Sequence, residues 1–366
     1  MTGVLKRGVT GRLSCLLAFL FLAGCYLSNT PIYPNADGYR TVEPAFFVDS
    51  NATITGIAGG DGMTVAVSSS GIIGFSADEG LSWSKIGPNG TLGTIEGDFA
   101  DSTAFNDVVY GEGYFLAGGA GGRAAWSLDG QNWQMGTIGP MGLKDIYCVA
   151  AGTVKYHKVF VAAGADGQIA WAQDHPEGPW HLSDQTPFGG VNESGQAVRD
   201  VAWGRVGGIG TFVAVGDDGR IGYLNDLSGK WYGGRVGAKR QETFRAVAFG
   251  NERFLAVGDN GIIMYATDPS TYSWKEITDS GFERRDLLGL VFDPVMSHFM
   301  TYSIDKAAGI SDYGEKWAVA AMRNLFSPFN PSVGPQPSDE SISAVGCSEK
   351  RLIFGSAGGA LAVSNY

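Results

Sequence analysis

The sequence has few charged residues, few cysteines and histidines, and only one long apolar run. Charged residues make up 17% of the 366 residues, against about 25% in an average soluble domain. The formal net charge is −11, which excludes a nucleic-acid-binding protein that relies on bulk positive charge. After residue 24, no apolar run reaches the length of about 20 residues that a membrane-spanning helix needs. We therefore expect no nucleic-acid partner.

Metal-binding patterns are also missing. The chain has only four histidines: His157, His175, His181 and His298. They show no ligand spacing such as His-Glu-x-x-His, and no Cys-x-x-Cys pair occurs. We therefore expect no metal site and no cofactor. Cys148 and Cys347 lie in different repeats, so they are expected to be buried free thiols.

Glycine, in contrast, is abundant. The chain has 56 glycines, about twice the usual share of roughly 7%, without the Gly-X-Y period of collagen. Hydrophobic residues make up 44% and aromatic residues 12%, which is too apolar for a disordered chain. This composition is typical of many short strands joined by glycine turns.

The first 25 residues resemble a bacterial lipoprotein signal. Three basic residues in Lys6–Arg12 precede the apolar segment Leu13–Leu22, and the sequence Leu-Ala-Gly-Cys ends at Cys25. An apolar segment this short is typical of a signal peptide. Small residues directly before a cysteine resemble the lipobox, in which the cysteine is lipidated and becomes the first residue. An ordinary signal peptide with a chance cysteine is the alternative.

The resemblance implies three parts: a signal peptide (residues 1–24), a lipidated tether (25–38) and the main domain (39–366). Palmitate would be among the acyl chains on Cys25, and the lipid would hold the protein on a membrane. Removal of the signal takes away three basic residues and leaves a formal charge of −14. The expected location is the bacterial cell envelope, in the outer membrane where the envelope has one.

Seven related units follow. In each unit an apolar segment runs into a glycine-rich turn, which is a hairpin signal. The seven copies are Val65–Gly71, Leu116–Gly122, Val161–Gly167, Val213–Gly219, Leu255–Gly261, Met300–Gly309 and Ile353–Gly359. A nucleotide-binding loop is an alternative for Gly118–Gly122, but no helix follows it that could hold phosphate.

A second apolar motif precedes each copy, starting at residues 55, 106, 144, 199, 245, 288 and 343. The spacing is close to the 40–50 residues of a propeller blade. We therefore predict an all-β fold, a seven-bladed β-propeller of four-stranded antiparallel blades. The last unit stops one strand short, so Tyr39–Val48 is predicted to pair with Leu361–Tyr366 and close the ring. A solenoid is the alternative.

Turns near the end of several units carry a Ser-x-Asp-x-Gly-x-Thr-Trp pattern or a shortened copy. Their residues are Ser76, Asp78, Gly80 and Trp83; Ser127, Asp129, Gly130 and Trp133; and Ser311, Asp312, Gly314 and Trp317. They resemble the Asp-box of BNR-repeat propellers, and Gly258–Gly261 with Asp268 and Trp274 is similar to photosystem II assembly-factor-like propellers. The resemblance covers about residues 40–366. It implies a structural role for the Asp-boxes, away from the ligand face.

The resemblance also bears on catalysis. Sialidases carry Asp-boxes, but their early Phe/Tyr-Arg-Ile-Pro motif is absent here, and no catalytic pair of carboxylates can be assigned. We expect a non-catalytic, monomeric envelope lipoprotein that binds or helps assemble a protein or acidic-glycan partner through one face of its central channel. The alternatives are a glycoside hydrolase of sialidase-like architecture and a surface adhesin. An adhesin should place its chemistry on long loops such as Pro88–Ala104, Asp184–Val198 or Phe326–Glu340.

The candidate ligand-binding residues are basic. In the aligned units the column that heads each first strand reads Thr55, Asn106, Lys144, Arg199, Arg245, Leu288 and Ser343. First strands line the channel in family propellers, so Lys144, Arg199 and Arg245 are expected at one mouth. Loops entering the fifth and sixth blades add Lys239, Arg240, Arg284 and Arg285. Such an arc would attract carboxylate or phosphate groups. The alternative is internal pairing with nearby acids: Asp107, Asp145, Asp200, Glu242, Glu283 and Asp286.

Overall fold

The structure is a computed structural model. It describes residues 39–42, 52–86, 94–96, 104–142, 144–183, 195–236, 241–269, 273–322, 329–330, 334–335 and 341–364. The expected signal peptide, Cys25 and the tether lie outside the described residues, as do Lys239 and Arg240 and most of the three long loops.

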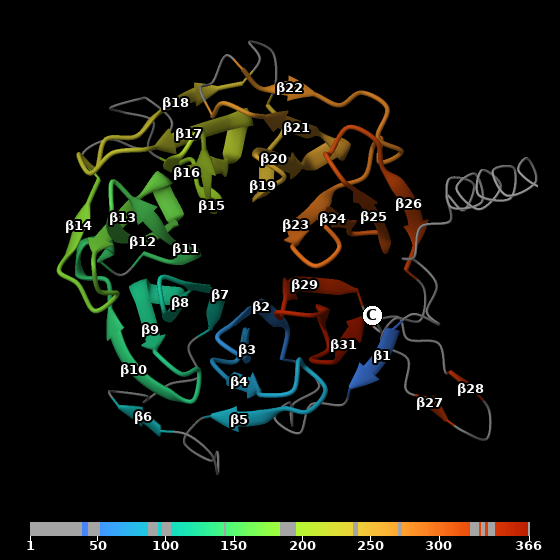
Figure 1. Ribbon diagram of the computed structural model, residues 1–366, viewed down its shortest axis with the longest axis horizontal. Coiled ribbons are helices and arrows are strands. Elements are labelled where there is room, and N and C mark those ends of the chain that lie inside the picture. Colours follow the sequence, from blue (N-terminus) through green and yellow to red (C-terminus); the bar gives the residue numbers. More distant parts are fainter. Residues whose placement is uncertain are drawn as a thin grey trace, which may run out of the picture.

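Seven antiparallel sheets are arranged around a central axis (Figure 1). Blade 1 consists of β2 (Ile54–Gly60), β3 (Met63–Ser68), β4 (Ile73–Ser76) and β5 (Ser84–Ile86). Blade 2 consists of β7 (Phe105–Gly111), β8 (Tyr114–Gly119), β9 (Arg123–Ser127) and β10 (Asn132–Thr137). Blade 3 consists of β11 (Ile146–Val154), β12 (His157–Gly164), β13 (Ile169–Gln173) and β14 (Trp180–Leu182).

The remaining blades follow the same order. Blade 4 consists of β15 (Val198–Val206), β16 (Ile209–Gly216), β17 (Arg220–Leu224) and β18 (Tyr232–Arg235). Blade 5 consists of β19 (Phe244–Gly250), β20 (Arg253–Gly258), β21 (Ile263–Ala266) and β22 (Lys275–Glu276). Blade 6 consists of β23 (Leu287–Asp293), β24 (His298–Ser303), β25 (Ala307–Ser311) and β26 (Ala318–Ala321). Blade 7 consists of β29 (Ile342–Cys347), β30 (Leu352–Ser356), β31 (Leu361–Ser364) and β1 (Tyr39–Val42).

An N-terminal strand closes the ring. Strand β1 pairs antiparallel with β31, so that Tyr39 lies opposite Ser364 and Val42 opposite Leu361. The last blade therefore takes its outer strand from the beginning of the chain. The predicted seven-bladed fold and its closure are both confirmed.

Two short elements add to the predicted plan. Strand β6 (Thr94–Glu96) runs parallel to β10 and gives blade 2 a fifth, outermost strand. Strands β27 (Phe329–Asn330) and β28 (Gly334–Pro335) form a separate two-stranded sheet within the long connection between blades 6 and 7. Both elements fall in the long interblade segments and leave the four-stranded cores unchanged.

The ring has two distinct faces. On the first, which we call the mouth face, short turns join the second and third strands of each blade. Five short 3-10 segments are described: η2 (Ala120–Gly122), η3 (Gly139–Met141), η4 (Ala165–Gly167), η5 (Asp217–Gly219) and η6 (Asp259–Gly261). Four of them, η2, η4, η5 and η6, form second-to-third-strand turns. The opposite face, which we call the hairpin face, carries the hairpins between first and second strands and the turns between third and fourth strands.

Glycines let neighbouring blades approach closely. A Cβ atom on Gly152 would overlap the indole ring of Trp203 in the next blade. In the same way, a Cβ on Gly204 would overlap the ring of Phe249, one blade further on. The chain thus places a glycine near the end of one first strand against a large ring from the next, which accounts for part of its glycine excess.

Candidate ligand site at the mouth of the central channel

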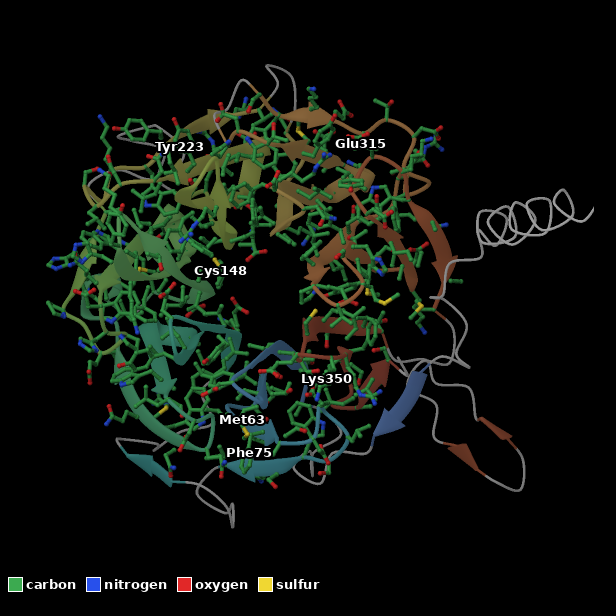
Figure 2. All side chains as sticks on the ribbon, viewed as in Figure 1. Met63, Phe75, Cys148, Tyr223, Glu315 and Lys350 are labelled. Atoms are coloured by element: carbon green, nitrogen blue, oxygen red, sulfur yellow. The ribbon has the colours of Figure 1, made fainter. Side chains whose placement is uncertain are left out.

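A cavity of about 370 Å³ lies at the centre of the ring, and all seven first strands contribute to its wall. Cys148 lies at the inner edge of blade 3 (Figure 2), among the residues that line this cavity, although its side chain is buried. The seven first strands, which are far apart in the sequence, bring their starting residues together around this cavity. The cavity is therefore the candidate site for a ligand.

A β-bulge near the start of each first strand determines which side chains reach the mouth. The pairing with the second strand shifts by one residue in every blade. The bulged residues are Thr55, Asn106, Tyr147, Arg199, Arg245, Leu288 and Ser343. Bulges re-aim side chains and are common next to functional sites.

The sequence alignment is wrong in blade 3. It placed Lys144 in the same column as Arg199, but the register places Tyr147 there, because Ile146 pairs with Gly164 as Val198 pairs with Gly216. Lys144 precedes the strand by two residues and does not line the cavity. Lys144-Asp145-Ile146 resembles Arg199-Asp200-Val201 in sequence, but the strand register places the equivalent position three residues later, at Tyr147.

Three bulged polar residues connect neighbouring blades. Thr55 Oγ1 donates to the carbonyl oxygen of Phe105 at 2.7 Å. Asn106 Nδ2 donates to the carbonyl of Ile146 at 2.7 Å. Ser343 Oγ donates to a first-strand carbonyl of blade 1, at Ile54, again at 2.7 Å. At these positions the bulge serves the ring and not a ligand.

In blades 4 and 5 the bulged residues are arginines, each paired with an aspartate of its own blade's mouth-face turn. Arg199 binds Asp217 through two hydrogen bonds, Nε to Oδ1 at 2.8 Å and Nη2 to Oδ2 at 3.3 Å. Arg245 Nε donates to Asp259 Oδ1 at 2.5 Å. The side chains of Arg199 and Arg245 remain 40% and 37% exposed. Internal pairing therefore occurs, although the partners are turn aspartates and not the acids next to the column.

Tyr147 supports Arg199 from the neighbouring blade. The Arg199 guanidinium carbon lies 5.6 Å from the centroid of the Tyr147 ring, within the range of a cation–π contact. Tyr147 also lines the cavity. Sequence reasoning missed this residue, and it missed Asp217 and Asp259. The signal available for these two aspartates was the Gly-Asp sequence that follows the second strands of blades 4 and 5.

The other basic residues lie at the edge of the mouth face. Lys144 pairs with Asp166 in η4, and Arg285 pairs with Asp305 in the corresponding turn of blade 6. The backbone N–H of Arg284 donates to the carbonyl of Asn260 in η6 at 3.2 Å. Lys239 and Arg240 lie outside the described residues. Of the five predicted residues that the structure describes, Arg199 and Arg245 line the cavity and the other three do not. The basic part of the cavity wall, as far as the structure describes it, therefore comes from blades 4 and 5.

Two acids also line the cavity, in blades 2 and 4. One oxygen of Asp107 accepts the N–H of Val149 in blade 3 at 2.9 Å, and one oxygen of Asp200 accepts the N–H of Val247 in blade 5 at 2.8 Å. The second oxygen of each accepts the N–H of the residue that follows it. Desolvation, together with the charge of Asp200, raises the pKa of Asp107 to about 8. Desolvation also raises the pKa of Asp200 to about 6.

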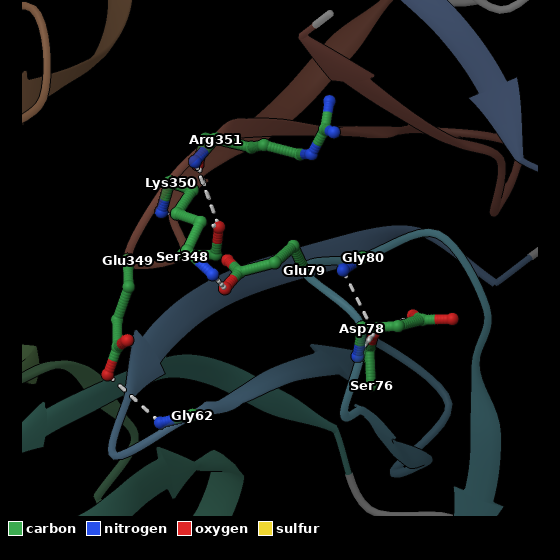
Figure 3. A network of polar contacts seen from close by, with 9 residues as sticks. All are labelled: Gly62, Ser76, Asp78, Glu79, Gly80, Ser348, Glu349, Lys350 and Arg351. Carbon is green, nitrogen blue, oxygen red and sulfur yellow. Dashed lines mark hydrogen bonds and ion pairs between the residues drawn. The ribbon is translucent and has the colours of Figure 1, made fainter. Parts of the chain in front are cut away.

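The Asp-box-like turns lie on the hairpin face. Ser76 Oγ accepts the N–H of Gly80 at 2.9 Å, Asp78 Oδ1 accepts the N–H of Ser82 at 2.7 Å, and Trp83 Nε1 donates to the Gly80 carbonyl at 2.9 Å. Figure 3 shows this turn beside the hairpin of blade 7, to which it is joined by the ion pair of Glu79 with Lys350.

The other two turns repeat this scheme. In each, the serine hydroxyl accepts the N–H of a glycine: Ser127 from Gly130, and Ser311 from Gly314. The indole N–H groups of Trp133 and Trp317 donate to the carbonyls of these glycines. Asp129 accepts the N–H of Asn132 at 2.7 Å. Asp312 instead has its carboxylate 3.9 Å from His298. These contacts are local, and they lie on the face opposite the arginines.

Both cysteines in the described residues are free thiols, Cys148 buried and Cys347 partly buried. Desolvation raises the pKa of each thiol, which opposes formation of a reactive thiolate. Within the part of the chain that the structure covers, no three His, Cys, Asp or Glu side chains are grouped to hold a metal ion. Among the same residues, no helix is long and apolar enough to cross a membrane.

Comparison with known proteins establishes the fold. No protein-family model matches the chain, and no curated protein matches it by sequence. Among solved structures, YCF48 from Cyanidioschyzon merolae is 14% identical with a TM-score of 0.62, over 89% of this chain and 98% of that chain.

Two further structures give similar values. YCF48 bound to D1 peptide is 14% identical with a TM-score of 0.63, over 90% of this chain and 95% of that one. A chain of the mitotic checkpoint complex is 13% identical with a TM-score of 0.62, over 100% of this chain and 99% of that one. At these identities the similarity concerns the propeller fold alone.

Proposed function

We propose that the chain is a non-catalytic, lipid-anchored envelope protein whose propeller binds an acidic protein segment at the mouth of the central channel. The observation that carries the proposal is the pair Arg199 and Arg245, two partly exposed guanidinium groups on the wall of one cavity. Guanidinium has five N–H donors in a planar fork that suits carboxylates. The two bonds to Asp217 use two of the five donors of Arg199.

The surrounding charges favour an acidic ligand at this point. Asp217 and Asp259 hold the arginines in place, which reduces the side-chain entropy lost on binding. Because the pKa of Asp107 is raised to about 8, this carboxyl group is mostly neutral at pH 7. The cavity wall that holds the two arginines therefore carries less negative charge at pH 7 than it would with an ionised Asp107.

The similar propellers support a peptide ligand. One of them, YCF48, is described as bound to D1 peptide, so a propeller of this fold can hold a peptide. An acidic glycan presents the same carboxylate chemistry and is the second ligand class to test. The Asp-box assignment and the lipoprotein anchor at Cys25 belong to this proposal, as does a location in the bacterial envelope.

The geometry argues against a glycosidase at this site. A hydrolase needs two carboxyl groups whose oxygens face the substrate. Asp107 and Asp200 line the cavity, but both oxygens of each accept backbone N–H groups. Such carboxylates are committed to holding blades together.

Replacing Arg199 and Arg245 together by glutamine tests the proposal. The partner is captured from detergent-solubilised native membranes on the immobilised wild type and on the double variant, over a series of salt concentrations. We expect the double variant to lose the captured protein and the wild type to lose it as salt increases, because screening weakens exposed charge pairs.

Lys316→Gln, at an exposed position in the Asp-box-like turn of blade 6 on the hairpin face, is the matched control and should capture as the wild type does. Pretreatment of the membranes with a protease or with a glycosidase distinguishes a protein from a glycan. Equal capture by the double variant at every salt concentration would refute the arginine site, provided that its melting temperature matches the wild type.

A further inference from the structure

Exposed apolar side chains are concentrated on the hairpin face. Among the described residues eight large hydrophobic side chains are exposed: Leu128, Tyr156, Leu182, Ile209, Tyr232, Val295, Ile304 and Tyr313. Five of them lie in hairpins or Asp-box-like turns of the hairpin face, and Ile304 alone lies in a turn of the mouth face. Tyr156 and Ile209, in the adjacent blades 3 and 4, are 99% and 54% exposed.

Tyr156 occupies a backbone position that disfavours it. In blades 1 to 5 the hairpins between first and second strands have two central residues, both with positive φ: Asp61-Gly62, Glu112-Gly113, Lys155-Tyr156, Gly207-Gly208 and Asn251-Glu252. Glycine fills the second position in three of these five hairpins. Tyr156 fills it with φ of 73°, although its ring packs against nothing. A strained, fully exposed aromatic residue indicates a function outside the fold.

Basic residues surround these two tips. Lys155 and Lys158 in blade 3 and Arg205 and Lys230 in blade 4 are all exposed. Burial acts to raise the pKa of Asp226. Hydrogen bonds from Ser228 and the charges of Lys155 and Lys230 outweigh burial, and the pKa of Asp226 is lowered overall. The lysines of both blades therefore lie close to this one carboxylate.

The hairpins between first and second strands carry an acidic residue at the tip in four other blades. Asp61, Glu112, Glu252 and Glu349 occupy the tips in blades 1, 2, 5 and 7. The hairpin face is therefore uneven. In blades 3 and 4 four exposed basic side chains lie near Tyr156, which has the largest exposed fraction among the large hydrophobic side chains that the structure describes, and near Ile209. Three acids, Asp174, Glu177 and Asp226, lie in the turns between third and fourth strands of the same two blades.

The chain enters the propeller on this same face. Tyr39 lies opposite Ser364, and the carbonyl and hydroxyl oxygens of Ser364 accept hydrogen bonds from Arg351 and Leu352, at the hairpin of blade 7. Residues 25–38 lie outside the described residues and precede Tyr39 directly. Fourteen residues can span at most roughly 50 Å, so a lipid on Cys25 would hold Tyr39, at the hairpin-face end of blade 7, within that distance of the bilayer.

We infer that the tips of blades 3 and 4 rest on an anionic bilayer surface, with Tyr156 and Ile209 at the headgroup level and Lys155, Arg205 and Lys230 facing lipid phosphates. The inference rests on the proposed anchor at Cys25. Tyrosine is favoured at the membrane interface, and lysine and arginine are attracted to anionic leaflets. The mouth face, with Arg199 and Arg245, then points away from the membrane and toward its partner.

A fluorescent label on the full, lipidated chain tests the orientation. Ile209→Cys carries the label on the hairpin face, and Ile304→Cys, 59% exposed on the mouth face, is the matched control. The protein is reconstituted in vesicles of phosphatidylethanolamine and phosphatidylglycerol. We expect lipids with quencher on their acyl chains to quench the label at position 209 and aqueous iodide to quench only the label at position 304.

Two variants and one lipid change sharpen the result. Tyr156→Gly, which suits the backbone, should reduce the protection of the label at position 209, as should vesicles of phosphatidylcholine alone. Equal access of iodide to both labels would overturn the inference. So would protection at position 209 that appears only after membrane proteins are added, because the occupant would then be a protein.

The anchor is tested separately by intact mass. If Cys25 carries no acyl chain, the lipoprotein proposal fails. The same labelled protein, added to vesicles from solution, then still reports whether the tips of blades 3 and 4 bind lipid. Failure of the anchor and failure of the surface are therefore distinguishable.

Discussion

The carboxylate of Asp200, in blade 4, accepts the backbone N–H of Val247, in blade 5, at 2.8 Å. Asp107 forms the equivalent bond to Val149, between blades 2 and 3. Both acids occupy the position after a first-strand bulge, where the side chain reaches the next blade. Two of the seven blade junctions thus depend on carboxyl groups whose pKa the fold raises.

This relationship predicts a pH-dependent stability. The pKa of Asp200 is about 6 in the folded chain and about 3.9 in an unfolded one. The folded state therefore binds more protons between these values, and the free energy of unfolding falls as pH rises from about 4 to above 6. Relative to Asp200→Asn, the wild type should lose roughly 3 kcal/mol over this range.

Urea unfolding at several pH values from 4 to 8 measures this difference. Asp107→Asn should remove the part of the fall that extends toward pH 8, because the wild-type carboxyl group titrates there in the folded chain. Asp61→Asn, at an exposed hairpin tip, reports the effect of removing one negative charge alone. Parallel curves for the wild type and Asp200→Asn would show that the carboxyl group is not coupled to folding.

Tyr156→Gly should stabilise the isolated propeller. The tyrosine has φ of 73°, and a left-handed conformation costs an L-residue about 1–2 kcal/mol. Little burial is lost, because the side chain is 99% exposed. We expect a gain of about 1 kcal/mol in the free energy of unfolding, measured in detergent without lipid.

Glu252→Gly, at the same position of blade 5 with φ of 59°, should give a similar gain. The two variants together separate backbone strain from any effect of the aromatic ring. A loss of stability in Tyr156→Gly alone would mean that the ring makes contacts within the fold.

Thr41→Pro should open the ring. Thr41 lies opposite Ala362 in the pairing of β1 with β31, and proline within a strand removes a backbone donor. Backbone amides of β31 should then exchange with solvent faster than those of blade 4, and the melting temperature should fall. Thr41→Ala keeps the donor and is the control; unchanged exchange in β31 of Thr41→Pro would show that closure adds no stability.

Cys25→Ser should abolish both the acylation of the chain and the removal of its signal peptide. If the lipobox is used, the variant keeps its signal unprocessed by the lipoprotein pathway and carries no acyl chain. Fractionation of cells with metabolic labelling by a fatty-acid analogue gives both readouts. A variant that remains membrane-associated and is processed like the wild type would contradict the lipoprotein assignment.

The fold could be predicted from sequence because it repeats. Seven glycine turns in phase with seven apolar segments specify blades, and the missing last strand indicated that Tyr39–Val48 closes the ring, as Tyr39–Val42 does. The residues of the candidate site were harder to predict from the sequence. Bulges shift the register by one residue, so the inward position of Tyr147 depends on hydrogen bonds that no local pattern encodes. The partners of Arg199 and Arg245 lie 18 and 14 residues away, which composition cannot reveal.

The glycine-to-ring contacts between blades have a further consequence. Blades 4 and 5 each present a glycine to the following blade, Gly204 and Gly250, and each sends a ring, Trp203 or Phe249, back to the glycine of the preceding one. Each of these blades therefore has a glycine on one side and a ring on the other, so a duplicated copy of either blade could pack against both of its neighbours in the same way. The strand from the start of the chain pairs only with β31 of the last blade, so it would close the ring whatever the number of blades before it. A relative could therefore gain or lose a blade and keep the same kind of junction, with the angle between neighbouring blades adjusted.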